Sequence, residues 1–327
     1  MEKRPRQHIH YLRTTDGVQL AWADASAGPL LIKAANWLTH LEYEWESPVW
    51  GHWLRFFSGH FRLVRYDERG CGMSDWNVGD LSPDGWIEDM EAVVAAAAPQ
   101  GPFALLGISQ GAVPAVSFAA RHPERVSHLL LYGAYARGWS RRGDPDAIRA
   151  YQAIVDLTRF GWGQDNPAFR QVFTSRFVPG ATEEQMNWFN ELCRKTTSPR
   201  IAADLLEARS KANVVDLLER VRTPTLVVHA RNDQVVPLAE GRLIASVGSR
   251  PVALIVPTRR SPTRDRTSWW DRERAGEPGC RFAVESRSKR CVRSSAAGTV
   301  LRSSAPLARQ ALHLLHLNSL TCALPRR

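Results

Sequence analysis

Apolar and polar positions along the chain follow two patterns, short apolar runs and longer segments with helical spacing. Apolar runs at residues 30–35, 61–66, 103–106, 126–132, 223–229 and 252–256 predict buried strands. Segments at 50–57, 82–98, 112–121 and 238–247 predict helices between them. Strands that alternate with helices in this way indicate an α/β fold with a mostly parallel sheet and helices on both of its faces.

Residues 9–25 alternate between apolar and polar positions around an Asp16-Gly17 pair. An Asp-Gly pair between alternating segments is a strong signal of a β-hairpin. We therefore predict that an antiparallel hairpin precedes the parallel strands.

The alternation of strands and helices is interrupted between residues 136 and 215, where helical patterns rich in Trp and Phe cover 147–160, 167–177, 183–195 and 199–210. This segment predicts a helical cap inserted between two strands of the sheet. The predicted organisation is a core of residues 1–135 and 216–257, a cap of residues 136–215, and an irregular C-terminal tail of residues 258–327.

The net charge of +10 raises the possibility of nucleic-acid binding, but its distribution argues against it. Residues 247–327 carry 16 Lys and Arg against 5 Asp and Glu, whereas residues 1–246 carry 27 against 28. The excess charge thus belongs to an Arg- and Ser-rich tail, a composition more typical of disorder than of a specific binding face. We expect no nucleic-acid partner.

Other features of the composition favour a cytoplasmic protein without a metal. No apolar run approaches 18 residues, so no membrane span is expected, and the basic start is not followed by the apolar core of a secretory signal. Five cysteines without framework spacing suggest reduced thiols. None of them has a Cys or His neighbour at zinc-ligand spacing.

The segment Gly107-Ile-Ser109-Gln-Gly111 carries the candidate chemistry, because it joins a predicted strand to a predicted helix of small residues. A G-x-S-x-G pattern in that context is typical of a nucleophile elbow, in which a sharp turn lifts the serine hydroxyl above the sheet. The first N–H groups of the helix then point to where an oxyanion would form. The alternative is a plain glycine-rich turn that happens to contain a serine.

These features resemble the α/β-hydrolase fold family over about residues 9–247. The resemblance rests on the elbow, on Asp67…Arg69-Gly-Cys-Gly-Met-Ser74, on 121–126 at the end of the elbow helix, and on Pro224…Asp233-Gln-Val-Val-Pro237. The sequence of residues 36–50 resembles that of a bacterial subgroup of this family, whose members are sometimes fused to cyclase or helix-turn-helix regulators.

The resemblance implies a serine hydrolase that forms an acyl-enzyme, with Ser109 as nucleophile and Asp233 as the acid that orients a histidine. The oxyanion donors would be the backbone N–H of Gln110 and that of Asn36 or Trp37. Alternatively, Asp233 caps the following helix and Trp37 packs under the cap. No metal or organic cofactor is implied.

The position of the histidine that Asp233 would orient departs from the family pattern. After Asp233 the chain has none until His313 and His316, and residues 257–266 stand where the family places one. A shifted reading frame would explain this tail, and we favour that explanation. The other explanation is a genuine extension that delivers His313 or His316 to the site.

The leading functional hypothesis is therefore a hydrolase of small-molecule carboxylic esters, including lactones. The aromatic cap suggests an apolar acyl or aryl group, with Trp162, Phe177 and Trp188 expected to influence chain-length preference. A cofactor-free haloperoxidase or a C–C hydrolase would use the same fold. From a different class, the chain could be a ligand-binding or sensory protein with a defective triad.

Overall fold

The computed structural model of the chain describes residues 5–98, 100–247, 251–256 and 283–285. His313, His316 and most of the predicted tail lie outside the described residues. The strands are β1 (Gln7–Arg13), β2 (Gln19–Ala25), β3 (Leu30–Lys33), β4 (Arg62–Tyr66), β5 (Phe103–Ile108), β6 (Val126–Tyr132), β7 (Thr225–Ala230), β8 (Pro251–Val256) and β9 (Ala283–Glu285).

The nine strands of the described residues join one sheet in the order β1-β2-β4-β3-β5-β6-β7-β8-β9. The strands from β4 through β3 to β8 run parallel, while β1, β2 and β9 pair antiparallel at the two edges. The predicted hairpin is β1–β2, and Gly17 in its turn has φ +89°. The mostly parallel α/β sheet predicted from the sequence is confirmed. Within the predicted tail, the three described residues form β9.

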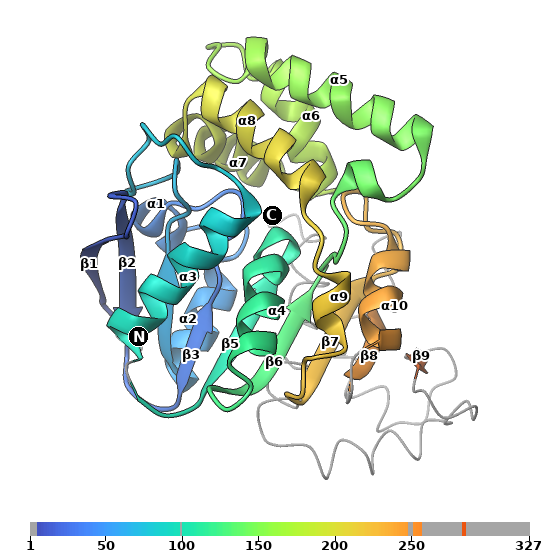
Figure 1. The fold of residues 1–327 in the computed structure, drawn as a ribbon. Helices are drawn as coiled ribbons and strands as arrows, with labels where there is room; N and C mark the ends of the chain where they lie inside the picture. The colour runs from blue at the N-terminus through green and yellow to red at the C-terminus, as the bar shows by residue number, and fades with distance from the viewer. Residues whose placement is uncertain (1–4, 99, 248–250, 257–282, 286–327) are drawn as a thin grey trace, which may run out of the picture.

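Helices cover both faces of the sheet (Figure 1). The helices of the core are α1 (Leu41–Trp45), α2 (Gly51–His60), α3 (Pro83–Ala97), α4 (Ala112–Arg121), α9 (Val215–Leu218) and α10 (Leu238–Val247). Along β5, Phe103 and Leu105 pack on the face covered by α3 and α4, whereas Ala104 and Leu106 pack on the face covered by α2. Because both faces of the strand are buried, its sequence is a continuous apolar run.

The start of α3 follows from its sequence. The Ser82 hydroxyl accepts the N–H of Gly85 and Pro83 occupies the first turn, as the pattern predicts. Its face toward the sheet carries Asp89, which binds the fully buried Arg69 through two N···O contacts of 2.8 and 2.6 Å. This bidentate pair fixes the turn that follows β4.

Four further helices stand between β6 and β7 and lie over one end of the sheet (Figure 1). They are α5 (Pro145–Gly161), α6 (Ala168–Phe177), α7 (Glu183–Thr196) and α8 (Pro199–Lys211). Their positions agree with the four helical segments predicted for the cap. Among the described residues, no helix has the length and apolar character that crossing a membrane requires.

Candidate active site

Ser109 stands in a tight turn between β5 and α4. The turn is a single 3-10 turn of Ser109–Gly111, and Ser109 has φ +50°, in the left-handed region that non-glycine residues rarely adopt. Such a conformation costs about 1–3 kcal/mol and persists only where the surrounding structure enforces it. The half-buried serine is thereby held at the carboxyl end of a central strand and the amino end of a helix.

The two glycines of the motif allow this turn to pack closely. A Cβ at Gly107 would lie 2.9 Å from the Cα of Ala112, and a Cβ at Gly111 would lie 2.8 Å from the carbonyl oxygen of Ala35. Real Cβ atoms do not come so close to backbone, so either side chain would force the elbow away from its neighbours. The spacing of the motif is therefore explained by sterics on both sides of the serine.

Replacing Gly107 or Gly111 with Ala is expected to lower the free energy of unfolding by about 1–3 kcal/mol, the usual cost of overpacking. Urea denaturation measures the change. Gly79→Ala is the matched control, because a Cβ at this exposed glycine meets nothing within 4 Å. Elbow variants as stable as the Gly79 variant would contradict the steric explanation.

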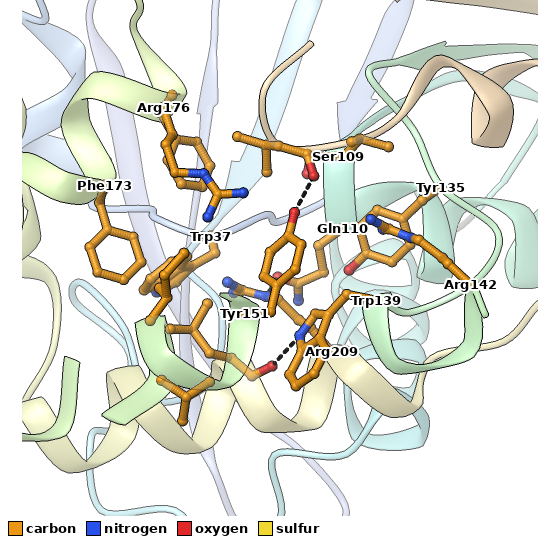
Figure 2. Close-up of a pocket in the computed structure, with 16 residues that line it drawn as sticks. Trp37, Ser109, Gln110, Tyr135, Trp139, Arg142, Tyr151, Phe173, Arg176 and Arg209 are labelled. Atoms are coloured by element: carbon orange, nitrogen blue, oxygen red, sulfur yellow. Dashed lines mark hydrogen bonds between the residues drawn. The ribbon is translucent and has the colours of Figure 1, made fainter. Parts of the chain in front are cut away.

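Ser109 opens into a pocket of about 640 Å³, a volume that includes space open to solvent. The cap contributes residues of α5, α6 and α8, so these helices cover the serine (Figure 2). The Tyr151 hydroxyl donates to the carbonyl of Val235, which ties α5 to the loop after β7. The lining residues are Trp37, Ser109, Gln110, Tyr135, Trp139, Arg142, Tyr151, Ile154, Val155, Phe173, Arg176, Phe177, Leu206, Arg209, Val235 and Val236.

Of the three aromatic cap residues singled out from the sequence, only Phe177 lines the pocket. Trp162 is fully buried and stacks on Trp37 with ring centroids 5.3 Å apart. Trp188 stacks on Tyr43 at 5.2 Å, away from the lining. These two tryptophans hold the cap on the core rather than shaping the pocket directly.

A buried polar cluster of Glu68, Gln110 and Arg209 lies beside Ser109. The Gln110 amide donates to one carboxylate oxygen of Glu68, and Arg209 approaches the other at 3.3 Å. Arg209 also donates to the Gln110 side-chain oxygen at 2.5 Å, and its guanidinium lies 4.3 Å from the ring centroid of Trp37. A cap residue therefore contacts the side chains of two residues, Gln110 and Trp37, that sequence reasoning named as oxyanion donors.

Burial dominates the electrostatics of this cluster. Desolvation raises the pKa of the Glu68 carboxyl, while Arg209 and the Gln110 amide act in the opposite direction. Burial also raises the pKa of the nearby Tyr135 hydroxyl to about 12, so this phenol stays neutral at physiological pH. Arg209 and Glu68 thus form a desolvated ion pair against the wall of the pocket.

Asn36 and Trp37 both follow β3, but only Trp37 lines the pocket. The side chain of Asn36 instead accepts a hydrogen bond from Lys33 at 2.5 Å and donates to the Trp37 carbonyl at 3.2 Å. Trp37 also packs against the cap through Trp162, so pocket lining and packing under the cap occur together.

Asp233 lies in the loop after β7 and is not among the residues that line the pocket. Its Oδ1 accepts the backbone N–H groups of Val235 and Val236 at 2.8 and 2.9 Å, which caps the loop. Its Oδ2 faces Gly133, 3.4 Å from where a Cβ would stand. The nearby His229 is buried, and its Nε2 lies 2.9 Å from the carbonyl oxygen of Val236.

No histidine lines the pocket within the described part of the chain. His313 and His316 lie outside the described residues, so the structure does not relate either of them to Ser109. The same described residues contain no group of His, Cys, Asp and Glu suited to hold a metal ion.

The chain matches a known protein family. A family model described as serine aminopeptidase S33, of the α/β-hydrolase type, matches residues 54–257, well over half of the 327 residues. The chain belongs to this family of α/β hydrolases. The match spans the elbow, the cap and the strands from β4 to β8.

Individual relatives of this hydrolase are distant. The AB hydrolase superfamily protein YisY of Bacillus subtilis is 26% identical over 70% of this chain and 83% of its own length. A bifunctional esterase/perhydrolase of Acinetobacter calcoaceticus is 25% identical over 69% and 83%. The solved structure of an esterase from Exiguobacterium antarcticum has a TM-score of 0.63 and 21% identity, and covers 75% of this chain and 89% of its own. The structural likeness shows the fold.

Sequence reasoning about this hydrolase missed all four charged residues of the pocket and the cluster, which are Glu68, Arg142, Arg176 and Arg209. Glu68 stands two residues after the end of a buried strand, which is a weak signal of a position at the carboxyl edge of the sheet. The three arginines belong to the cap segment. Arg176 and Arg209 lie on predicted helices, where a charged residue normally indicates a solvated face, and Arg142 lies before the first of these helices. Nothing in their spacing distinguishes them from the other arginines of the cap.

Proposed function

We propose that this hydrolase cleaves carboxylic esters through an acyl-enzyme on Ser109. The observation that carries the proposal is the position of Ser109, held at φ +50° at the amino end of α4 and at the wall of a pocket covered by the cap. A serine in such a strand–turn–helix setting is the feature that ester-cleaving enzymes of this fold use. The esterase/perhydrolase relative also supports an ester substrate.

In the proposed reaction the Ser109 oxygen attacks the ester carbonyl carbon and its proton passes to a base. The tetrahedral oxyanion accepts hydrogen bonds from the backbone N–H of Gln110 and from that of Asn36 or Trp37. Its collapse breaks the bond to the alcohol, which leaves with the proton from the base. Water then attacks the acyl group, again assisted by the base, and releases the acid and free Ser109. No cofactor enters this sequence.

Purified full-length protein with p-nitrophenyl acetate and butyrate tests the proposal. An acyl-enzyme predicts a burst of p-nitrophenol followed by turnover, and a mass increase of one acyl group on the peptide that contains Ser109. Absence of burst, turnover and acylation would favour the second candidate, a ligand-binding or sensory protein with an incomplete triad. The observation favouring that candidate is the absence of a histidine from the described lining of the pocket.

The proposed reaction requires a histidine base, and Asp233 is the acid proposed to orient it. If His313 or His316 is the base, its replacement by Ala is expected to remove nearly all turnover, because an unassisted serine hydroxyl is a weak nucleophile at neutral pH. Steady-state rates of each single variant and of the double variant identify it. Unchanged rates in all three would leave only the oxyanion hole and binding to support activity, and would strengthen the reading-frame explanation of the tail.

Phe177 is expected to limit the length of the acyl group. Its half-buried ring lines the pocket, so Phe177→Ala should raise the ratio of hexanoate to acetate hydrolysis by about tenfold or more, since one methylene in an apolar pocket changes a specificity constant by at least about that factor. Specificity constants on p-nitrophenyl esters of increasing length measure the ratio. Trp188→Ala is the control, since that ring packs on Tyr43, outside the lining. An equal shift in both variants would mean that cap stability, not pocket shape, sets the preference.

A further inference from the structure

The charged side chains that line the Ser109 pocket are all of one sign. They are Arg142, Arg176 and Arg209, with no Asp or Glu among the described lining residues. Arg209 has its charge balanced by Glu68 at 3.3 Å. The other two form no ion pair with any carboxylate in the described part of the chain, although most other arginines at the surface of the cap have one.

Arg142 and Arg176 are nevertheless held in place. Arg142 donates to the Arg137 carbonyl at 3.0 Å, and its guanidinium lies 5.2 Å from the ring centroid of Tyr135. Arg176 donates to the Gln234 carbonyl at 3.0 Å and lies 4.8 Å from the ring centroid of Tyr151. A guanidinium has five N–H donors, so each retains donors beyond its one bond to the protein. Figure 2 shows both groups directed into the pocket from different sides.

From this arrangement we propose that the pocket selects esters that carry a carboxylate, bound by Arg142 and Arg176. This inference rests on the proposed function, because it names the class of ester that Ser109 would cleave. A fixed, half-buried guanidinium without a counter-ion attracts an anion, and a carboxylate matches the fork of its N–H groups. The aromatic and aliphatic residues that also line the pocket accommodate the apolar chain that separates the carboxylate from the ester.

Binding tests the inference without relying on catalysis. Isothermal titration of the full-length protein with glutarate is expected to give saturable binding, with glutaramide binding at least tenfold more weakly. Arg142→Gln and Arg176→Gln should each raise the Kd for glutarate about tenfold, the usual loss for one hydrogen bond between charged groups. Arg176→Lys, which keeps the charge, should recover part of the loss. Arg149→Gln is the matched control, because this exposed arginine of α5 pairs with Asp146 outside the pocket.

Hydrolysis assays distinguish a failure of the carboxylate site from a failure of the proposed ester hydrolysis. With p-nitrophenyl hemiglutarate the two Gln variants should lose about tenfold more in kcat/KM than they lose with neutral p-nitrophenyl butyrate, whereas Arg149→Gln should leave the ratio of the two specificity constants unchanged. Glutarate binding that depends on the arginines, without hydrolysis of either ester, would refute the proposed function and leave the carboxylate site standing. Hydrolysis of butyrate with no preference for hemiglutarate, and glutarate binding unchanged in both Gln variants, would overturn the inference and leave the function standing.

Discussion

Replacing Ser109 with Ala is expected to abolish hydrolysis of p-nitrophenyl butyrate while the urea midpoint of unfolding stays close to that of the wild type. Ser109 supplies the only hydroxyl at the elbow, and loss of a triad nucleophile lowers kcat by about a millionfold in a serine protease. The backbone need not change, because Ala and Ser face the same steric cost at φ +50°. Turnover and denaturation of the same preparation measure both effects.

Ser175→Ala is a suitable control for this substitution. Ser175 is an exposed serine of α6 that does not line the pocket, so its loss should change neither rate nor stability. A small residual rate in Ser109→Ala is compatible with the mechanism, since the oxyanion hole and substrate binding can accelerate attack by water on their own. Turnover near the wild-type rate would place the activity elsewhere and refute the role of Ser109.

The sequence predicts the fold well because the features that determine it are local. Continuous apolar runs indicate strands buried on both faces, and Ser82-Pro83 defines the start of α3. The Asp16-Gly17 pair locates the hairpin, and the motif around Ser109 places a serine in a strand–turn–helix context. Each signal spans only a few residues, so neighbouring side chains and turn sterics alone decide it.

The chemistry of the pocket could not be predicted in the same way, because it depends on long-range contacts. Glu68 and Arg209 are 141 positions apart, and only the docking of α8 on the core brings them together. Helical periodicity also does not say which apolar face of a cap helix turns toward the pocket. For that reason Phe177, which lines the pocket, and Trp162, which packs on Trp37, were indistinguishable from sequence.

Arg209→Met is expected to destabilise the protein by about 3–5 kcal/mol near neutral pH, the cost of leaving one member of a buried ion pair without its partner. Glu68 is 2% exposed and Arg209 is 7% exposed, so water cannot readily replace the lost contact. The change also removes the hydrogen bond to Gln110 and the stacking on Trp37. Urea denaturation measures the loss. Arg200→Met, which removes an exposed arginine of the same helix, should cost less than about 1 kcal/mol.

Combining Glu68→Gln with Arg209→Met should recover stability relative to Arg209→Met alone, because Gln still accepts the Gln110 amide and brings no charge into the cluster. A coupling free energy of about 1–3 kcal/mol is expected from the double-mutant cycle. If the decreases in the free energy of unfolding caused by Glu68→Gln and by Arg209→Met simply add in the double variant, the ion pair is not what stabilises the cluster.

The pH dependence of the stability of the Arg209→Met variant tests independently whether the unpaired Glu68 carboxylate causes the destabilisation. Burial holds the pKa of Glu68 above its unfolded value of 4.5, and removal of Arg209 takes away the nearest charge that lowers it. The folded state then favours the neutral acid, whose contribution to stability is complete below the unfolded pKa and is lost as pH rises through the folded pKa. The stability difference between variant and wild type should therefore grow as pH is raised from about 4 to 7. A difference that stays constant over this range would show that lost packing on Trp37, rather than an uncompensated carboxylate, destabilises the variant.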